Sequence, residues 1–495
     1  MKEFLTISSY IFLLLSCTSC YKEVVVFNPD PNNALELEKI LRLNNKDCSF
    51  DESSNTLRYS IPSSNIKDFE VLVEFQDYSK VYFNDSLLSN NSINNFGSIE
   101  VNRDYPVLVI TNEIAHELKL QFTNLPIVQI ITHNRIVDEP KVLARLVINY
   151  PSIEQDKTVS YIGLEYRGET SQSHPKKSFS FCFLNSLFTN DKISKSIFQL
   201  PENSDWWLDA MYIDKSRLRN KTSFDIWRQI EGSRNYGINS SFVELYINSE
   251  HQGLYSINEF INAESLNLLS DDAVLYKAVD WSGPRFDFYS EDVSINKYWD
   301  GWEQKFPDVK NRINWQPLLY LRNLIINGSS NDFTSYIDKM IHLDNFIDYY
   351  IFLNLSSSLD NVAKNNFLSR QSNKDPLCII PWDMDGSFGL MWNGDYISHT
   401  YILSNNLFDR LLDMESGQFK NNLKLRWTSL REESLNNDNL MNLFEGNFNC
   451  INTSNIIQIE NNTWNTNINL EEEKIFIHNW LSNRLSFLDD YYLNL

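Results

Sequence analysis

The chain has 495 residues, of which 42% are hydrophobic and 14% aromatic, so it is long and apolar enough to bury a sizeable core. The length predicts two or three domains, and the aromatic content excludes a mainly disordered chain. The 65 acidic and 43 basic residues give a net charge of -22, with no run of Lys and Arg interleaved with aromatics. We therefore expect no nucleic-acid partner.

Residues 1–19 predict a lipoprotein signal peptide. Lys2 precedes a short apolar run at residues 10–15, which suits the core of a signal peptide and is too short to span a bilayer. Small residues then lead into Cys20, as in a bacterial lipobox, with Cys17 as the alternative lipidation site. An ordinary secretory signal with incidental cysteines is the other alternative. We expect export to the cell envelope and a lipid anchor at Cys20, on the outer membrane or cell surface.

The four remaining cysteines are far apart and include no C-x-x-C pair, so neither a zinc site nor a disulfide framework is predicted. Cys182 and Cys378 lie in apolar, strand-like runs. We expect both to be buried core thiols.

Residues 20–125 predict a small β-sandwich domain of the immunoglobulin-like (Ig-like) type. From about Val24 to Ile130, short alternating runs such as residues 71–75 and 107–110 are separated by Asn, Ser, Asp and Gly turns. No chemistry is apparent in this part. We expect a spacer that holds the following domain away from the membrane.

Residues 126–495 predict one α+β domain with two lobes. Strand patterns come first and helix patterns later, which favours a strand-rich lobe at about 140–260 and a helical lobe at about 261–495. The segments that carry these patterns are residues 142–183 (strands), 218–230 (a helix), 242–257 (a hairpin), and 346–355 and 475–492 (helices).

Four polar residues have the spacing of a phosphoryl-transfer site. Asp360 is followed five residues later by Asn365, and a strand-like run then leads to Asp383 and Asp385 beside a glycine. In such sites the first Asp orients or deprotonates a hydroxyl, and the Asn and the later Asp hold magnesium. Both later carboxylates would face one metal–phosphate cluster, because residues two apart in a strand share a face. An ordinary acidic turn is the alternative on this local pattern alone.

A second segment has the composition of a phosphate-covering loop. A strand ends at Arg167 and Gly168, a small-residue loop includes Ser171, and the next strand begins with Lys176 and Lys177. Backbone N–H groups, hydroxyls and one lysine are suitable donors to a triphosphate. Neighbouring side chains of a strand point to opposite faces, so only one lysine reaches the phosphates, and either is possible. An exposed hairpin with a basic tip is the alternative.

A third segment supports the site rather than forming it. Trp206 and Trp207 are expected to pack in the core instead of forming a stacking platform. Arg219, at the start of a helix, is expected to pair with a buried carboxylate and fix that helix.

Together, and in one order, these segments resemble the CotH kinase family. The family's Arg-Gly-Asn-Ser-Ser loop with paired lysines is matched by residues 167–177, and its Pro-Trp-Asp-x-Asp segment by residues 381–385. The similarity extends over about residues 125–495. The other matching positions are Trp207, Asp214, Lys215, Arg219, Asn220, residues 243–246, residues 253–255, Glu259, residues 407–411, Trp480 and Arg484.

The resemblance implies an atypical protein-kinase-like fold that binds ATP and a divalent cation such as Mg²⁺. It also implies transfer of the γ-phosphate to a serine or similar hydroxyl, here on an envelope or surface protein that the sequence does not identify. Carried over by position, Asp360 is the catalytic base, and Asn365 with Asp383 or Asp385 holds the metal. The positions implied for nucleotide binding are Arg167, Gly168, Ser171, Lys176 or Lys177, and Trp382.

One residue departs from the family pattern, since Glu169 stands where the loop has asparagine. A carboxylate there would repel phosphates unless a metal offsets it or the side chain turns outward. A non-catalytic pseudokinase or structural envelope-binding module is therefore the alternative function. A third is a carbohydrate-handling lipoprotein, in which Asp360 and Asp385 would be the paired carboxylates.

Overall fold

The structure, a computed structural model, describes Val24–Val25 and residues 39–495 except 102, 153–154, 169, 232–234, 284, 288–292, 294 and 415–417. The predicted signal peptide lies outside the described residues, as do Cys17, Cys20 and Glu169. No helix in the described part of the chain is long and apolar enough to span a membrane.

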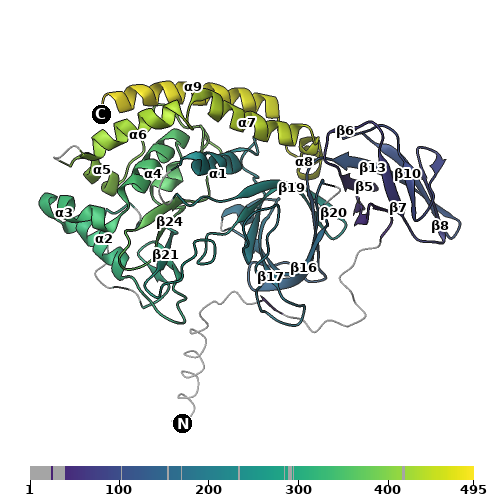
Figure 1. Cartoon of the computed structure of the whole chain (residues 1–495), viewed down its shortest axis with the longest axis horizontal. Helices are drawn as coiled ribbons and strands as arrows, with labels where there is room; N and C mark the ends of the chain where they lie inside the picture. The colour runs from purple at the N-terminus through teal and green to yellow at the C-terminus, as the bar shows by residue number, and fades with distance from the viewer. Residues whose placement is uncertain are drawn as a thin grey trace, which may run out of the picture.

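Two packed sheets form the N-terminal part of the molecule, at the right in Figure 1. Alternate residues of their strands face a shared core that includes Leu57, Val73 and Phe122. The strands are β2 (Arg42–Leu43), β3 (Lys46–Asp47), β4 (Ser49–Asp51), β5 (Thr56–Ser60), β6 (Asn65–Ile66), β7 (Glu70–Glu74), β8 (Ser79–Phe83), β9 (Ser86–Leu87), β10 (Ser92–Asn95), β11 (Ile99–Glu100), β12 (Tyr105–Thr111) and β13 (Ile114–Thr123). The larger sheet has the order β4-β5-β13-β12-β8-β9, the smaller has β10-β7-β2-β3, and β6 pairs with β11 in a separate two-stranded sheet.

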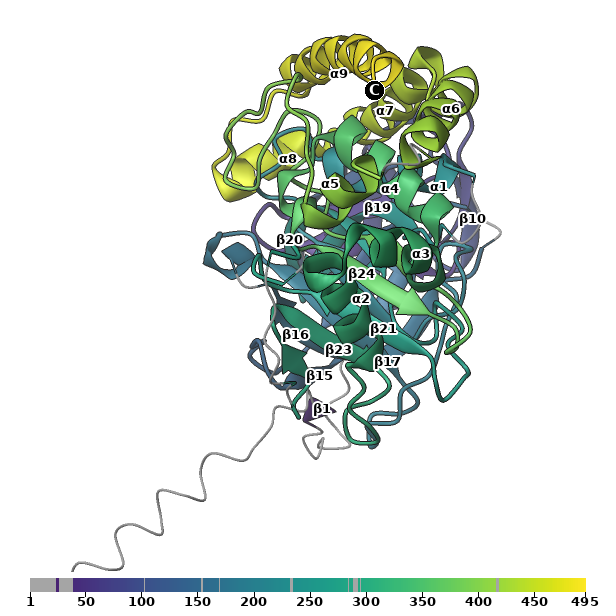
Figure 2. The ribbon, with the colours of Figure 1, turned by 90° about the vertical axis from the view of Figure 1, so that its left-hand side faces the viewer.

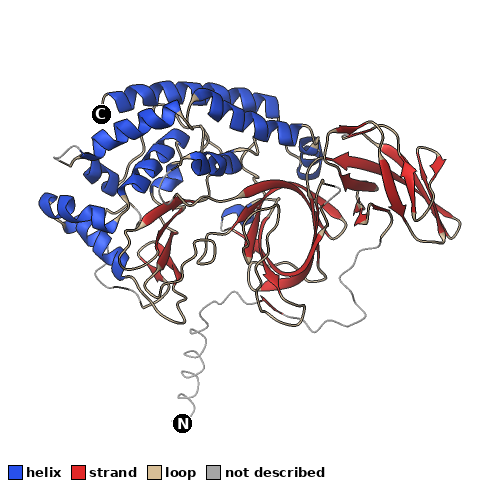
Figure 3. Cartoon of the chain, viewed as in Figure 1, coloured by secondary structure: helices blue, strands red, loops and turns tan. Residues whose placement is uncertain are grey.

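The largest sheet, formed by the middle part of the chain, closes on itself, and Figure 3 shows it as a ring of red strands in the middle of the molecule. Its strands are β1 (Val24–Val25), β14 (Ile127–Ile131), β15 (Lys141–Asn149), β16 (Thr158–Arg167), β17 (Ser178–Leu184), β18 (Asp205–Asp209), β19 (Ser240–Ile247) and β20 (Glu250–Glu259). The order β15-β14-β19-β20-β18-β17-β16 returns to its start, because β16 pairs with both β17 and β15. The ring encloses an apolar core that includes Val128, Phe181 and Leu208.

The short strand β1 corrects one sequence expectation. The sequence placed Val24 in the N-terminal sandwich, whereas β1 pairs in parallel with Lys141 and Val142 of β15. The pairing is possible because β14 covers only residues 145–149 on that side of β15 and leaves its first backbone groups available.

The N-terminal sheets dock directly on the closed sheet. Arg58 of β5 forms a buried ion pair with Glu244 of β19, with Nε–Oε2 and Nη2–Oε1 distances of 2.5 and 3.0 Å. Arg58 Nη2 also donates to the Ser454 carbonyl at 3.2 Å, and Lys46 Nζ donates to the Tyr150 carbonyl at 3.0 Å. The part of the chain expected to be a spacer thus shares a buried polar contact with the next part.

Another, smaller sheet lies in the region that the sequence predicted to be helical. Its strands are β21 (Val274–Ala278), β22 (Tyr298–Trp299), β23 (Trp302–Phe306), β24 (Asn366–Arg370) and β25 (Cys378–Pro381), in the order β22-β23-β21-β24-β25. Apolar runs this short do not distinguish a strand from part of a buried helix. The pairing partners of β21 and β24 are also far apart in the sequence, so local patterning does not reveal this sheet.

Helices cover the small sheet and one side of the closed sheet. Figures 1 and 2 place α4 between β24 and the long outer helix α9. The α-helices are α1 (Arg219–Gln229), α2 (Gln316–Asn327), α3 (Ser330–Met340), α4 (Leu343–Ser356), α5 (Asn406–Leu412), α6 (Gln418–Glu432), α7 (Asn437–Asn452), α8 (Ile456–Trp464) and α9 (Leu470–Leu493), with the 3-10 helices η1 (Thr170–Ser173) and η2 (Leu359–Val362). The expected helices at 218–230, 346–355 and 475–492 are confirmed as α1, α4 and α9. The fold is mixed α+β.

Candidate functional site

Most of the candidate site residues meet at one end of the small sheet, against the rim of the closed sheet. Asn366 of β24 pairs with Pro381 of β25, and Lys277 of β21 pairs with Phe367. The residues next to these pairs along the chain therefore lie at the same end of the small sheet. Trp382 connects the two sheets, because its ring centroid lies 5.3 Å from that of Trp207 on β18.

Asp360 lies in η2 at this sheet end and is largely buried. Its Oδ2 is 3.1 Å from Lys364 Nζ, and its Oδ1 is buried without a hydrogen-bond partner among the described residues. Burial raises the pKa of Asp360, nearby Lys364 lowers it, and the charge of Asp383 raises it again, with a net upward shift. A carboxylate with an unused oxygen and a raised pKa is suited to accepting a proton.

Asn365 and Asp383 hold the chain in two tight turns beside Asp360. Both are in the left-handed region, with φ of 57° and 55°, which Asn and Asp tolerate better than other residues with a side chain. The Asn365 carbonyl accepts from the Trp382 N–H at 3.0 Å and from Asn361 Nδ2 at 2.8 Å. These bonds fasten the two turns to each other.

A further carboxylate, that of Asp209, comes from the end of β18. Asn220 of α1 links Asp209 to the segment between Asp383 and Asp385, since its Nδ2 donates to Asp209 Oδ2 at 2.7 Å and its Oδ1 accepts from the Met384 N–H at 2.9 Å. Burial, followed by the charges of Asp383 and Asp209, raises the pKa of Asp385 well above its usual range. Burial also raises the pKa of Asp209. Asp209 was not among the residues predicted from the sequence, although it ends an apolar strand just as Asp383 follows one.

These carboxylates have the chemistry of a hard divalent-cation site. Like charges at the half-buried Asp383, Asp385 and Asp209 are costly without a cation, and carboxylate oxygens are the ligands that Mg²⁺ prefers. In the described part of the chain, no group of three or more His, Cys, Asp or Glu is arranged to hold a metal by itself. Proteins commonly hold Mg²⁺ with one or two carboxylates, together with water and phosphate, so Asp383 and Asp385 fit it as a pair.

Arg167 brings positive charge to the same place. Its Cζ lies 3.7 Å from the Trp207 ring centroid and 4.8 Å from that of Trp382. Burial lowers the pKa of Arg167 to about 10, and the charge of Asp383 opposes this shift. Its Nη1 is buried without a hydrogen-bond partner among the described residues. The structure thus joins Arg167 and Trp382 to the carboxylates, in keeping with their grouping in the sequence analysis.

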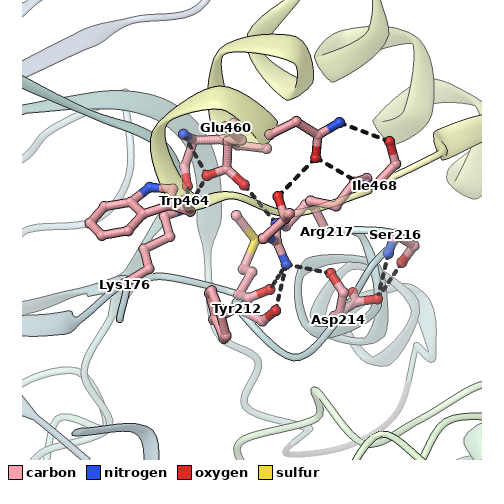
Figure 4. Close-up of polar contacts among 12 residues, drawn as sticks. Lys176, Tyr212, Asp214, Ser216, Arg217, Glu460, Trp464 and Ile468 are labelled. Carbon is pink, nitrogen blue, oxygen red and sulfur yellow. Dashed lines mark hydrogen bonds and ion pairs between the residues drawn. The ribbon is translucent and has the colours of Figure 1, made fainter. Parts of the chain in front are cut away.

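The two lysines of the loop segment bind other partners in the structure. Lys176 is fully buried, and its ammonium contacts the Glu460 carboxylate and the Leu254 carbonyl, as Figure 4 shows for the ion pair. Burial lowers the pKa of Lys176 to about 8, against the opposing effect of Glu460. Lys177 Nζ donates to the Gln172 carbonyl at 2.6 Å. Among the described residues, neither ammonium is in direct contact with the site carboxylates, although the charge of Asp209 acts on Lys176, and a phosphate contact by either lysine stays a prediction.

Gly168 and Ser171 form a loop closed by its own contacts. Gly168 has a φ of 91°, and a Cβ there would lie 1.9 Å from Ser171 Oγ, so only glycine fits. Ser171 Oγ donates to the Arg167 carbonyl at 3.1 Å, which ties the loop to the end of β16.

The supporting roles expected from the sequence are confirmed. Arg219 Nη1 lies 2.5 Å from Asp214 Oδ1 in a buried ion pair, and Arg219 Nε donates to the Ser387 carbonyl at 3.0 Å. Trp206 and Trp207 are almost fully buried in the core. Cys182 and Cys378 are buried core cysteines.

The fold and the site define a mixed α+β protein in which acidic turns of a small sheet meet a half-buried Arg and two buried Trp residues at the rim of a closed sheet. The sequence model of the family described as CotH kinase protein matches residues 164–488, more than half of the chain, so the chain belongs to this family. A similar protein is the inner spore coat protein H of Bacillus subtilis (strain 168), which is 24% identical over 308 residues, covering 59% of this chain and 77% of that protein. The family resemblance seen in the sequence is confirmed.

Proposed function

We propose that the chain is an atypical, two-lobed kinase that binds ATP with a divalent cation and transfers the γ-phosphate to a serine or similar hydroxyl. The proposal is supported above all by the meeting of Asp360, Asp383 and Arg167 at one sheet end. Asp360 has an unused buried oxygen there, and the charge of Asp383 acts on both other groups. In this proposal the closed sheet belongs to one lobe and the helices to the other.

Each group has a defined part in the transfer. The hydroxyl proton moves to Asp360, a bond forms between the hydroxyl oxygen and the γ-phosphorus, and the bond from that phosphorus to the bridging oxygen breaks to release ADP. Asp383 and Asp385, with Asn365, would hold Mg²⁺, which neutralises charge on the phosphates when bound. Arg167 supplies a fixed positive charge for the same purpose.

Transfer of labelled γ-phosphate tests this assignment. With Mg²⁺ present, we expect autophosphorylation or labelling of a serine-rich protein by the wild type. Loss of a catalytic base costs about 100-fold or more, so Asp360→Asn and Asp383→Asn are both expected to abolish detectable labelling. Asp338→Asn, on the exposed side of α3, is the matched control and should label normally.

Two results would count against the proposal. Labelling that persists unchanged in Asp360→Asn and Asp383→Asn would remove both residues from the mechanism. A folded wild type without any nucleotide-induced rise in its unfolding temperature would instead support the pseudokinase or structural module.

We also propose export and lipidation at Cys20, which rests on the lipobox-like sequence alone. Labelling with an alkyne analogue of palmitate in cells is expected to mark the wild type and the Cys17→Ala variant, and not the Cys20→Ala variant. Labelling that depends on Cys17 instead would move the anchor site.

A further inference from the structure

A second cation, Lys277 of β21, faces the same indole as Arg167. Lys277 Nζ lies 5.7 Å from the Trp382 ring centroid, and Arg167 Cζ lies 4.8 Å from it. The two side chains come from different sheets, and the sequence analysis singled out only Arg167. Trp382 thus lies near two cations at the point where the small sheet meets the closed sheet.

Neither cation has a carboxylate in direct contact among the described residues. Asp383 acts on both through space, while the nearby Glu303 is already paired with Lys305 at 3.0 Å and with Lys297 at 3.5 Å. Burial and then the charge of Arg167 lower the pKa of Lys277 to about 8. Two half-buried like charges beside one indole are costly, and a bound anion would offset the cost.

The neighbouring carboxylates restrict which anion fits. A simple anion beside Asp383 and Asp385 would be repelled by them. A phosphate chain that carries a divalent cation satisfies both sets of charges at once, because the metal faces the carboxylates and the phosphate oxygens face the cations. The arrangement therefore favours a metal-bound polyphosphate over a bare monoanion.

We propose that Lys277 and Arg167 are the cations that bind the nucleotide phosphates in this protein, in place of Lys176 or Lys177. This inference rests on the proposed kinase function and deepens it. Lys176 is already paired with Glu460, and Lys177 with carbonyls of its own loop, so a phosphate would have to displace those partners. Among the residues that the structure describes, Lys277 and Arg167 have no such partner to give up.

Calorimetric titration with Mg²⁺ and adenosine, AMP, ADP or β,γ-imido-ATP tests the inference. Wild-type affinity is expected to rise with the number of phosphates. A charge-assisted contact accounts for about a 10- to 100-fold difference in affinity, so Lys277→Met should weaken binding of β,γ-imido-ATP by that factor. Adenosine affinity should change by less than about twofold, because adenosine carries no charge for Lys277 to contact. Lys277→Arg should retain most of the affinity.

Lys195→Met is the matched control. Lys195 Nζ also lies 5.7 Å from an aromatic ring, that of Phe183, but in the segment between β17 and β18. Burial lowers the pKa of Lys195, whereas the charge of Asp383 also acts on Lys277. The Lys195→Met variant should bind all four ligands like the wild type. The unfolding temperature of each variant checks that the fold is intact.

The possible results test the role of Lys277 and the proposed kinase function separately. Equal weakening of adenosine and β,γ-imido-ATP in Lys277→Met would overturn the inference, because it indicates altered packing of Trp382. Unchanged binding of β,γ-imido-ATP would overturn it as well. In both cases a nucleotide-binding wild type leaves the proposed function standing, whereas a wild type that binds none of the four ligands refutes the function and the inference together.

Discussion

Removing the Glu460 carboxylate is expected to be among the most destabilising single changes in this protein. Glu460 of α8 is fully buried and contacts the Lys176 ammonium, Arg217 Nε at 2.9 Å and the Leu254 N–H at 3.1 Å (Figure 4). These partners come from the start of β17, the segment before α1, and β20. One carboxylate therefore joins three segments that are distant in sequence.

The size of the effect follows from what Glu460→Ala leaves behind. Removal of one partner from a buried ion pair costs about 3–5 kcal/mol, because the remaining charge is left without compensation. Lys176 has a pKa lowered to about 8 and can release its proton, whereas Arg217 stays charged. We therefore expect a loss of about 3 kcal/mol, near the lower end of that range.

Urea unfolding followed by tryptophan fluorescence measures this loss. Glu445→Ala is the control, since Glu445 pairs with Lys474 at 2.8 Å on the surface and exposed pairs contribute about 1 kcal/mol or less. Adding Lys176→Met to a Glu460→Gln variant should recover part of the stability, because it removes the unpaired charge. The reasoning is refuted if Glu460→Ala is no more destabilising than Glu445→Ala.

Three further predictions concern pH and the loop. Burial alone would raise the pKa of Glu244, but Arg58 and His251 outweigh burial and lower this pKa to about 2. The ionised Glu244 carboxylate therefore contributes about 3 kcal/mol to the free energy of unfolding. This contribution is complete above pH 4.5 and is lost as the pH falls toward 2. The unfolding free-energy difference between wild type and Glu244→Gln should therefore shrink below pH 4.5, and a constant difference would contradict this. Gly168→Ala should lower stability by about 1–2 kcal/mol in thermal unfolding, because the residue has a left-handed φ and its Cβ would clash with Ser171 Oγ; unchanged stability would show that the loop rearranges freely. Glu169→Asn, which restores the asparagine typical of the family, is expected to tighten ATP binding in calorimetry if the loop covers the phosphates as proposed, because it removes a negative charge. Unchanged binding would indicate that Glu169 turns outward, and weaker binding that it holds metal.

The sequence by itself determined the elements with a strong local period. Apolar residues recur with the helical period in α1, α4 and α9, and alternate with polar ones in strands such as β7 and β12, so these elements follow from local patterning. The family also follows from the sequence, because its motifs occur in one order along the chain.

Only the tertiary structure decided which side chains meet. Periodicity shows that a residue is buried but not what surrounds it, so only the packing of α8 on β20 shows that Glu460 is the partner of Lys176. The same holds for Lys277, whose short strand has no local signal and acquires a role only because β24 and β25 bring Trp382 and Asp383 beside it. The residues that follow a strand-like run identified the carboxylates in the sequence. Only the pairing of strands distant in sequence showed which cations lie beside those carboxylates.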